Sequence, residues 1–266
     1  MKIAVCLKQV PDSWAEKKMV DGRLDRESVD AVLNDLDEYA IEEVLRLVEP
    51  LNEAAGSEVH TVTLLSMGPD RASEAIRKGL SMGAHDAILV SDPALAGSDA
   101  LATSKVLAKV IADGSFDLVF CGTESTDARM SVIPAMLAER LGWAHLTFAG
   151  AVRVDIESKK VEIDRMTEFG VETMSASLPA VVSVIEKINE PRYPSFKGIM
   201  AAKKKTIDTK SLASIGIESS AVGASASWSK VESATARPPR EKGIKVEDSG
   251  DGGDKLFDFL MEKRLV

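Results

Sequence analysis

The sequence predicts an open α/β fold: a doubly wound, mainly parallel sheet with an added β-hairpin and an extended C-terminal arm. Short apolar runs alternate with amphipathic helical segments over roughly the first 145 residues. Repeated strand–helix units wind into a parallel sheet because crossover connections are right-handed. After residue 146 the pattern changes to strands with alternating faces, and a Ser- and Gly-rich stretch precedes the final apolar segment. These two changes predict the hairpin and the arm.

The predicted parallel strands are continuous apolar runs. Runs of this kind suit strands that are covered on both faces. In the first half of the chain they are residues 2–7, 59–65, 86–90 and 116–121, and residues 179–187 add a later one.

The first long helix is predicted over residues 34–49. Its apolar residues share one face, and the opposite, solvent-directed face holds Glu42, Glu43 and Arg46. Asn34 is predicted to cap this helix, ahead of an acidic first turn that suits the positive end of the helix dipole.

Three more helices follow from the same periodicity. Residues 70–82 keep the helical spacing up to Gly83, which is a natural C-terminal stop. Residues 98–112 and 131–141 behave similarly, and the first turn of the latter accepts Pro134.

The second half of the chain predicts a hairpin, a loop and a tail. Two alternating strands, 146–158 and 159–169, turn near Ser158 and Lys159. Two prolines and a glycine within residues 191–198 exclude regular structure there and predict an ordered or mobile loop.

The predicted organisation has three parts. Residues 1–217 form the α/β domain, which includes a loop at 187–205; residues 218–254 form a linker; and residues 255–266 form an arm. A short amphipathic end behind a linker has little of its own domain to cover it. We therefore expect the arm to pack on another chain rather than to dock back.

Composition excludes several classes of protein. The net charge of -9 over 266 residues argues against broad nucleic-acid binding, which needs a basic face. No apolar stretch reaches the ~18 residues of a membrane span, and the N-terminus reads as a strand rather than a signal peptide. Two cysteines and three histidines show no metal-ligand spacing. A cytoplasmic globular protein is expected.

The most suggestive site follows Gly122. Ligands of open α/β sheets bind outside the carboxyl ends of the strands, and here hydroxyl side chains and Asp127 lead into a helix start that suits a phosphate. The alternative is an ordinary loop that merely caps the helix, and composition alone favours it. Neither a Walker motif nor GxGxxG is present.

No catalytic constellation is evident. The histidines are predicted to be structural, the cysteines to pack as small apolar groups, and no acid is paired with another by spacing. The residues weighed are His60, His85, His145, Cys6, Cys121, Asp12, Glu124 and Asp127. A ligand crevice without an acid–base team suggests a cofactor that carries the chemistry.

A basic segment interrupts this acidic chain. Residues 187–205 hold six basic residues against one acid, together with aromatic and aliphatic side chains. This composition is typical of a docking patch, in which apolar anchors supply affinity and charge steers encounter. The alternative is a solvated loop whose aromatic side chains tuck inward.

Several stretches resemble one known family, the beta (small) subunits of electron-transfer flavoproteins, in their bacterial form. The matching motifs are IAVCLKQVPD, NDLDEYAIEEVLRL, LLSMGP, FDLVFCGTESTD and, most specific, LPAVVSVIEKINEPRYPSFKGIMAAKKK. The resemblance covers nearly the whole chain and implies an adenine-nucleotide-hydrolase-like sheet.

The resemblance implies an electron carrier subunit rather than an enzyme. Such subunits pair with an alpha subunit, share its FAD at the interface, and hold an AMP of their own. The pair accepts electrons from soluble dehydrogenases, such as the acyl-CoA dehydrogenases of fatty acid beta-oxidation, and passes them to a membrane quinone oxidoreductase. The tail would reach across the alpha subunit.

The resemblance also implies site residues. Leu36 and residues 12–14 would approach the flavin. The cofactor-binding positions would be Cys6, Asn34, Asp35, Leu36, Asp37, Met67, Gly122, Thr123, Glu124, Ser125, Thr126, Asp127, Ala128, Arg129, Met130, Ser131, Val132 and Ile133. The partner-recognition positions would be Pro191, Arg192, Tyr193, Phe196, Ile199, Met200, Lys203, Lys204 and Lys205.

Two departures from the family pattern bear on the nucleotide. The chain has Asn34-Asp35 where relatives often have Asn-Pro, and 131–134 reads SVIP where relatives often have Gln, then Thr or Val, and Gly. AMP, a second FAD as in bifurcating relatives, and an empty crevice therefore stay open. The alternative function is a stand-alone adenine-nucleotide-binding module of universal-stress-like type, which would need neither the 187–205 segment nor the tail.

Overall fold

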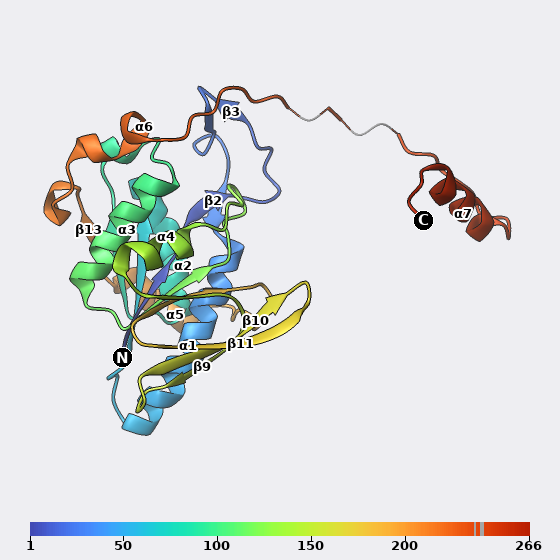
Figure 1. Ribbon diagram of the computed structural model, residues 1–266. Coiled ribbons are helices and arrows are strands. Elements are labelled where there is room, and N and C mark those ends of the chain that lie inside the picture. Colours follow the sequence, from blue (N-terminus) through green and yellow to red (C-terminus); the bar gives the residue numbers. More distant parts are fainter. Residues whose placement is uncertain (237, 240–241) are drawn as a thin grey trace. The chain divides into compact units, whose positions relative to one another are not determined.

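A nine-stranded sheet forms the centre of the computed structural model, which describes residues 1–236, 238–239 and 242–266 (Figure 1). In spatial order its strands are β11 (Gly170–Ser177), β10 (Lys160–Thr167), β9 (Ala144–Asp155), β12 (Ala180–Val184), β8 (Leu118–Gly122), β1 (Lys2–Cys6), β6 (Thr61–Met67), β7 (Asp86–Val90) and β13 (Asp208–Lys210). The pairs from β9 to β13 are parallel, and β9, β10 and β11 are antiparallel. The predicted doubly wound sheet with an added hairpin is confirmed.

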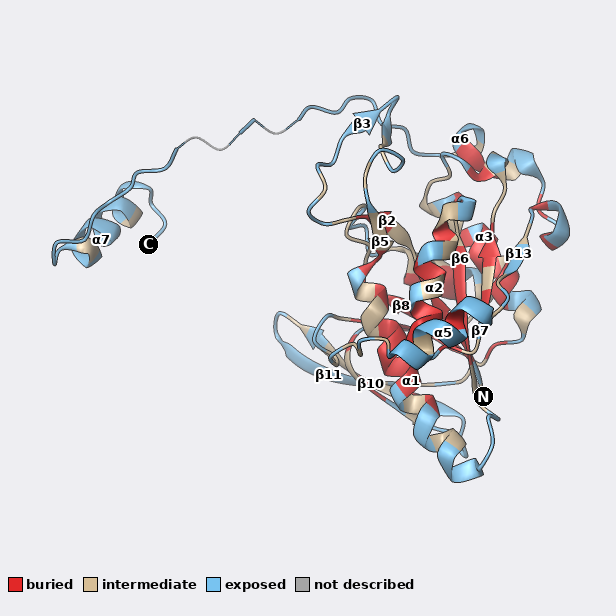
Figure 2. Ribbon diagram, turned by 180° about the vertical axis from the view of Figure 1, so that it is seen from behind, coloured by how far each residue is buried: buried red, intermediate tan, exposed pale blue. Residues whose placement is uncertain are grey.

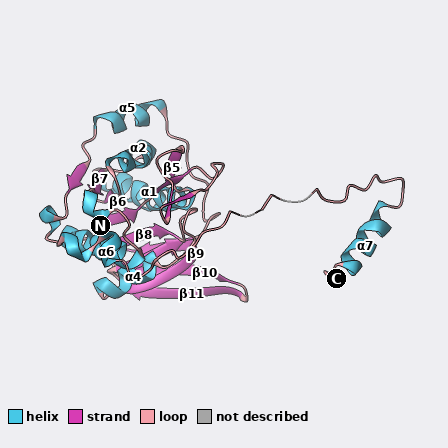
Figure 3. Ribbon diagram, turned by 90° about the horizontal axis from the view of Figure 1, so that it is seen from above, coloured by secondary structure: helices cyan, strands magenta, loops and turns pink. Residues whose placement is uncertain are grey.

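Helices cover both faces of the sheet (Figure 3). They are α1 (Asp35–Ala55), α2 (Ser73–Met82), α3 (Ala100–Gly114), α4 (Ile133–Leu141), α5 (Phe196–Lys204) and α6 (Gly223–Ala226), with 3-10 turns η1 (Asp70–Ala72), η2 (Pro93–Leu95), η3 (Ala213–Ile215) and η4 (Ser219–Ala221). One apolar core lies between the sheet and α1, α2 and α5, and a second lies between the sheet and α3 and α4. Figure 2 shows this buried material in the sheet and on the inner helix faces.

Most predicted elements are present, and the strands that were not predicted, β13 among them, are polar or very short. Strand β11 was not predicted because its side chains are largely exposed and carry no apolar alternation. Two small antiparallel pairs were also missed: β2 (Gln9–Pro11) with β5 (Ala31–Leu33), and β3 (Met19–Val20) with β4 (Arg23–Leu24). Strands of two or three residues are too short to show a period.

Helix α1 follows the prediction on its apolar face but not on the opposite one. Its predicted core residues are buried, and it ends at Gly56 in the left-handed conformation. Glu42 and Glu43, predicted to face solvent, are instead 5% and 9% exposed. They are buried because Asn189 and Arg192 of the segment after β12 lie over them and bond to their carboxylates.

The exclusion of regular structure from 191–198 was wrong at its C-terminal end, where α5 begins. The Ser195 hydroxyl caps the helix by accepting a hydrogen bond from the Gly198 N–H (3.1 Å). Pro191 and Pro194 precede this cap, so they remove no helical hydrogen bond. A Cβ at Gly198 would lie 2.5 Å from the carbonyl oxygen of Ser81, so glycine allows α5 to approach α2 closely.

The chain divides into a first unit, Met1–Glu232, and a second, Ser233–Val266. The predicted linker starts later than residue 218, because η4 and α6 belong to the first unit and Val222 is buried there. The second unit contains helix α7 (Gly252–Glu262), which is amphipathic and has no buried residue. Among the described residues no helix is both long and apolar enough to cross a membrane.

Candidate functional site

The strand order reverses between β1 and β8, and we call the region outside the carboxyl ends of these two strands the crevice. The chain proceeds from β1 to β6 and β7 on one side and then crosses to β8 on the other. At such a reversal the loops that leave the carboxyl ends of the two strands diverge and open a ligand crevice. The predicted cofactor-binding residues after β1, after β8 and at the start of α1 all lie around this point.

Asn34 joins the start of α1 to the loop after β8. It occupies the N-cap position as predicted, but its side chain makes no capping bond. Its amide nitrogen donates to the Glu124 carbonyl (3.0 Å), and its amide oxygen accepts from the Thr126 N–H (3.0 Å). Asn34 is 1% exposed, so a buried amide that is bonded through both its nitrogen and its oxygen fixes the shape of this loop from within.

Asp37 is a buried carboxylate one turn further along α1. It accepts hydrogen bonds from the backbone N–H groups of Lys8 (2.8 Å) and Gly122. Burial raises its pKa to about 7, because desolvation outweighs these bonds. A Cβ at Gly122 would lie 2.7 Å from the Asp37 carboxylate and 2.8 Å from the Leu36 carbonyl carbon, so this close approach requires glycine.

Lys8, Asp127 and Arg26 form an ion cluster at the mouth of the crevice. The Lys8 ammonium lies 3.0 Å from one Asp127 oxygen, and Arg26 bonds to the other. The Asp127 side chain is fully buried. Burial alone would raise the pKa of Asp127, but Lys8, the Ser125 hydroxyl and Arg26 together lower it to about 2. Burial also lowers the pKa of Lys8.

Arg26 and Lys17 were missed as site residues. Both belong to the excursion between β2 and β5, where Arg26 reaches Asp127 and the Lys17 ammonium donates to the Thr126 carbonyl (3.1 Å). The excursion carries no sequence period, and its contacts with the loop after β8 span about a hundred positions. No local pattern in the sequence indicates them.

In the loop from 123 to 132, the Glu124 carboxylate holds two residues of the second half in place. Arg129 and Ser131 adopt left-handed backbone conformations (φ 47° and 55°) and both bond to the Glu124 carboxylate. Residues 128–131 are exposed, and α4 then begins at Ile133 with Pro134 in its first turn, as predicted. The first N–H groups of such a helix have no intrahelical partner and suit an anion.

The remaining predicted positions line the walls of this region. Cys6 and Cys121 are register partners on β1 and β8, both buried, and contact with the Cys6 thiol together with burial raises the pKa of Cys121. The Thr123 hydroxyl donates to the Val184 carbonyl (2.6 Å), and Met67 ends β6 half-buried. No group of three metal-ligating side chains occurs in the described part of the chain.

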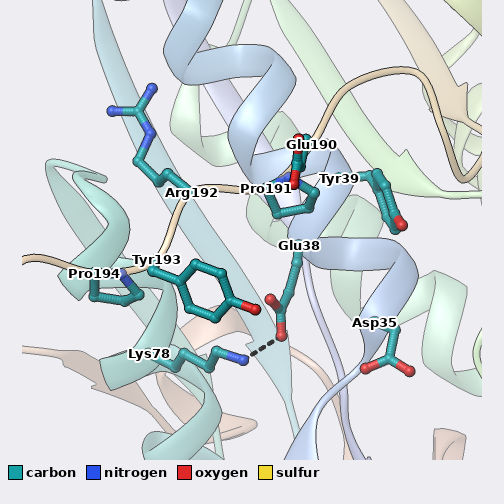
Figure 4. Close-up of a pocket in the computed structure, with 9 residues that line it drawn as sticks. All are labelled: Asp35, Glu38, Tyr39, Lys78, Glu190, Pro191, Arg192, Tyr193 and Pro194. Carbon is teal, nitrogen blue, oxygen red and sulfur yellow. Dashed lines mark hydrogen bonds and ion pairs between the residues drawn. The ribbon is translucent and has the colours of Figure 1, made fainter.

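The predicted partner-recognition residues form a separate surface on and before α5, which we call the docking surface. Tyr193 and Phe196 are 96% and 80% exposed, and Ile199 and Met200 are also exposed, so the aromatic side chains do not tuck inward. Beside them lies a pocket of about 280 Å³ between Tyr193 and α1, where Lys78 pairs with Glu38 (Figure 4). The docking surface and the crevice share helix α1, whose N-terminus forms one wall of each.

Fold and site together define an α/β protein with a cluster of charged side chains outside the carboxyl ends of β1 and β8 and a separate surface of exposed apolar side chains. The family model for the electron transfer flavoprotein domain matches residues 21–215. An electron transfer flavoprotein subunit beta from Mycobacterium bovis is 47% identical over 99% of both chains, and one from Megasphaera elsdenii is 36% identical over 100% of this chain and 98% of the relative. Protein FixA from Azotobacter vinelandii is 35% identical over 96% of this chain and 91% of the relative.

The chain belongs to the electron transfer flavoprotein family and is similar over its full length to the beta subunits. The resemblance noted in the sequence is therefore confirmed. Membership implies a flavin-related role in electron transfer.

Proposed function

We propose that this chain is the beta half of a heterodimeric electron carrier whose FAD is shared with an alpha subunit. In this proposal the carrier works in the cytoplasm, accepts electrons from soluble dehydrogenases such as the acyl-CoA dehydrogenases of fatty acid beta-oxidation, and delivers them to a membrane quinone oxidoreductase. The observation that carries it is the full-length similarity to proteins named as beta subunits, a name that implies a second subunit.

The crevice between β1 and β8 is proposed to hold the nucleotide of this chain, AMP or a second FAD. The donor set fits a phosphate-bearing ligand: two cations, Lys8 and Arg26, share one carboxylate, and the Ser125 hydroxyl lies beside them. The loop to Ile133 adds the free N–H groups of the first turn of α4. In this chain those residues would bind and orient the nucleotide. A bound flavin would supply reversible electron uptake.

The flavin shared with the alpha subunit is proposed to lie near Leu36 and residues 12–14. Trp14 supports this placement because its indole is 94% exposed on the excursion beside the crevice. The amphipathic helix α7 is the proposed contact of the arm with the alpha subunit, since a single helix of 11 residues forms no core of its own to cover its apolar face. A stand-alone nucleotide-binding module would leave both α7 and the docking surface without a role.

Co-expression with an alpha subunit tests the proposal. We expect a yellow heterodimer, and deletion of residues 250–266 should weaken its assembly without unfolding the first unit. Mass spectrometry of the nucleotides released on denaturation distinguishes one FAD with one AMP from two FAD or from FAD alone. A colourless chain that associates with no flavoprotein subunit would refute the proposal.

The donor side is tested at Phe196, the proposed apolar anchor of the docking surface. Phe196→Ala should raise the apparent KM of the heterodimer for an acyl-CoA dehydrogenase while the flavin content stays the same, because the side chain meets the partner and not the cofactor. Loss of flavin from this variant would contradict the assignment.

A further inference from the structure

We propose that Arg192 is a positioning residue that holds the docking surface in its final shape before a partner arrives. It does so through Glu42 and Glu49 of α1, and we call these three residues the latch. The inference deepens the proposed function, because it assumes that the surface around Phe196 docks a partner, and it separates Arg192 from the residues that touch that partner.

The guanidinium of Arg192 makes four hydrogen bonds inside the chain. Its Nε donates to one oxygen of Glu42 (2.7 Å) and its Nη2 to the other (3.1 Å), while both Nη atoms bond to Glu49. The backbone N–H of Arg192 also donates to Glu42 (3.2 Å). Bidentate pairing of this kind fixes direction as well as distance. In Figure 4 the Arg192 side chain points away from Tyr193.

Glu42 makes the latch costly to open. This carboxylate is 5% exposed, and Arg192 is the cation paired with it among the described residues. Removing the partner of a buried charge strongly destabilises the folded protein, whereas an ion pair exposed to water contributes little to its stability. Glu49 is half-exposed, so Glu42 carries most of the latch and Glu49 the smaller part.

Other contacts fix both ends of the segment that carries the docking surface, residues 189–205. On the N-terminal side the Asn189 amide donates to the Tyr39 carbonyl and to the Glu43 carboxylate, both at 3.0 Å. On the C-terminal side the Arg77 guanidinium donates to the carbonyl oxygens of Ala202 and Lys205, and the Lys205 ammonium donates to the Ala84 carbonyl (2.6 Å). Lys205 is thereby bonded within the chain.

Between these anchors the apolar side chains are left exposed. Tyr193 follows the latch directly, and Phe196 starts α5 three residues later. A surface that is already ordered loses less conformational entropy when a partner binds. The latch therefore sets affinity through Tyr193 and Phe196 without touching the partner.

The test uses the flavin-loaded heterodimer carrying Arg192→Gln, with Arg153→Gln as the matched control. Arg153 also pairs with two carboxylates, Glu162 and Asp164, but on the sheet. In Arg192→Gln we expect at least tenfold faster hydrogen exchange over residues 189–199 and about a tenfold higher apparent KM for an acyl-CoA dehydrogenase, with kcat and flavin content unchanged. Arg192→Lys, which keeps the charge but not the bidentate geometry, should fall between wild type and Arg192→Gln.

A second variant separates positioning from overall stability. Glu42→Gln with Arg192→Gln removes the unpaired buried charge, so the melting temperature should recover while exchange and KM stay raised. If the double variant restores the melting temperature, the exchange rate and the KM together, Arg192 acts only through overall stability and the proposal is refuted. Unchanged exchange in Arg192→Gln would also overturn it.

The Phe196→Ala variant separates a failure of the latch from a failure of the proposed docking role. If Phe196→Ala leaves the KM unchanged, the docking role is refuted. Hydrogen exchange in Arg192→Gln then still tests whether the latch orders residues 189–199. Should Phe196→Ala raise the KM while Arg192→Gln changes neither exchange nor KM, the docking role stands and the latch is refuted.

Discussion

The crevice and the docking surface both carry their charged groups on segments outside the main sheet, but they place charge in opposite ways. In the crevice, a buried carboxylate is paired with two partly exposed cations: the Asp127 side chain is fully buried between Lys8 and Arg26. At the docking surface, the ionic groups lie beneath and at the ends, and Tyr193 and Phe196 face outward. Polar groups fixed inside a fold suit a small charged ligand, whereas exposed apolar side chains on a fixed base suit a protein partner.

The pH dependence of stability gives the largest expected effect, and it belongs to the crevice. The pKa of Asp37 is raised to about 7 in the folded state, so the folded chain binds a proton that the unfolded chain releases near pH 4. Stability from this group is present below pH 4 and falls as the pH rises to 7, by about 1.4 kcal/mol per pH unit. Urea unfolding between pH 4 and 8 measures it.

Asp37→Asn should flatten this slope, because the amide oxygen still accepts the Lys8 N–H without carrying a charge. Asp35→Asn, an exposed site in the same helical turn, is the matched control and should keep the wild-type profile. A wild-type slope that survives in Asp37→Asn would show that another group titrates.

Close packing at the crevice gives the next largest effect. In Gly122→Ala the added methyl group would meet the Asp37 carboxylate and the backbone of Leu36. Overpacking of this kind costs about 1–3 kcal/mol, measurable by chemical denaturation. Gly243→Ala is the control, because a Cβ there meets nothing within 4 Å. Equal stability of the two variants would mean that the contact with α1 relaxes freely.

The ion cluster predicts a smaller effect, which appears in acid. The pKa of Asp127 is lowered to about 2, so its contribution is present above pH 4 and is lost as the pH falls from 4 to 2. Asp127→Asn should cost about 1–2 kcal/mol at pH 7 and should lack this acid-dependent loss. Urea midpoints at pH 2 to 7 test it, and an unchanged acid limb would contradict the assignment.

At the docking surface we expect charge reversal to have the smallest effect on stability and a clear effect on the rate of association with a partner. Reversing Lys203 and Lys204 to Glu should change stability by less than about 0.5 kcal/mol. Association with an acidic dehydrogenase surface should slow at low salt and approach wild type at high salt, because screening removes steering. Stopped-flow rates across ionic strengths measure this, and equal rates at low salt would exclude steering. Lys205 is left intact because it bonds to Ala84.

The parallel sheet was predictable because each of its buried strands is a continuous apolar run. Strand β8 and helix α4, with Pro134 in its first turn, follow from local pattern alone. The loop between them stood out as a candidate site by its small and hydroxyl residues at a strand end, although composition alone favoured an ordinary capping loop, and a ligand there stays a prediction. Local sequence did not reveal that Asn34 joins this loop instead of capping α1, since that bond links positions some ninety residues apart.

Helix α5 and the buried glutamates of α1 were also not predictable from local sequence. Pro191 and Pro194 were taken to exclude regular structure, but they precede the Ser195 cap and leave the helix after it intact. The charge of Glu42 predicts exposure on a helix considered alone. It is buried because a cation from another part of the chain pairs with it.

The sequence by itself determined the doubly wound sheet, the basic segment and the family, since each depends on neighbouring residues or on a long match of motifs. Tertiary structure alone decided which charges are paired: Lys8 and Arg26 with Asp127, and Arg192 with Glu42. The physical reason is that a charge is stabilised by whatever lies near it in space, and the fold brings these groups together from distant positions in the chain.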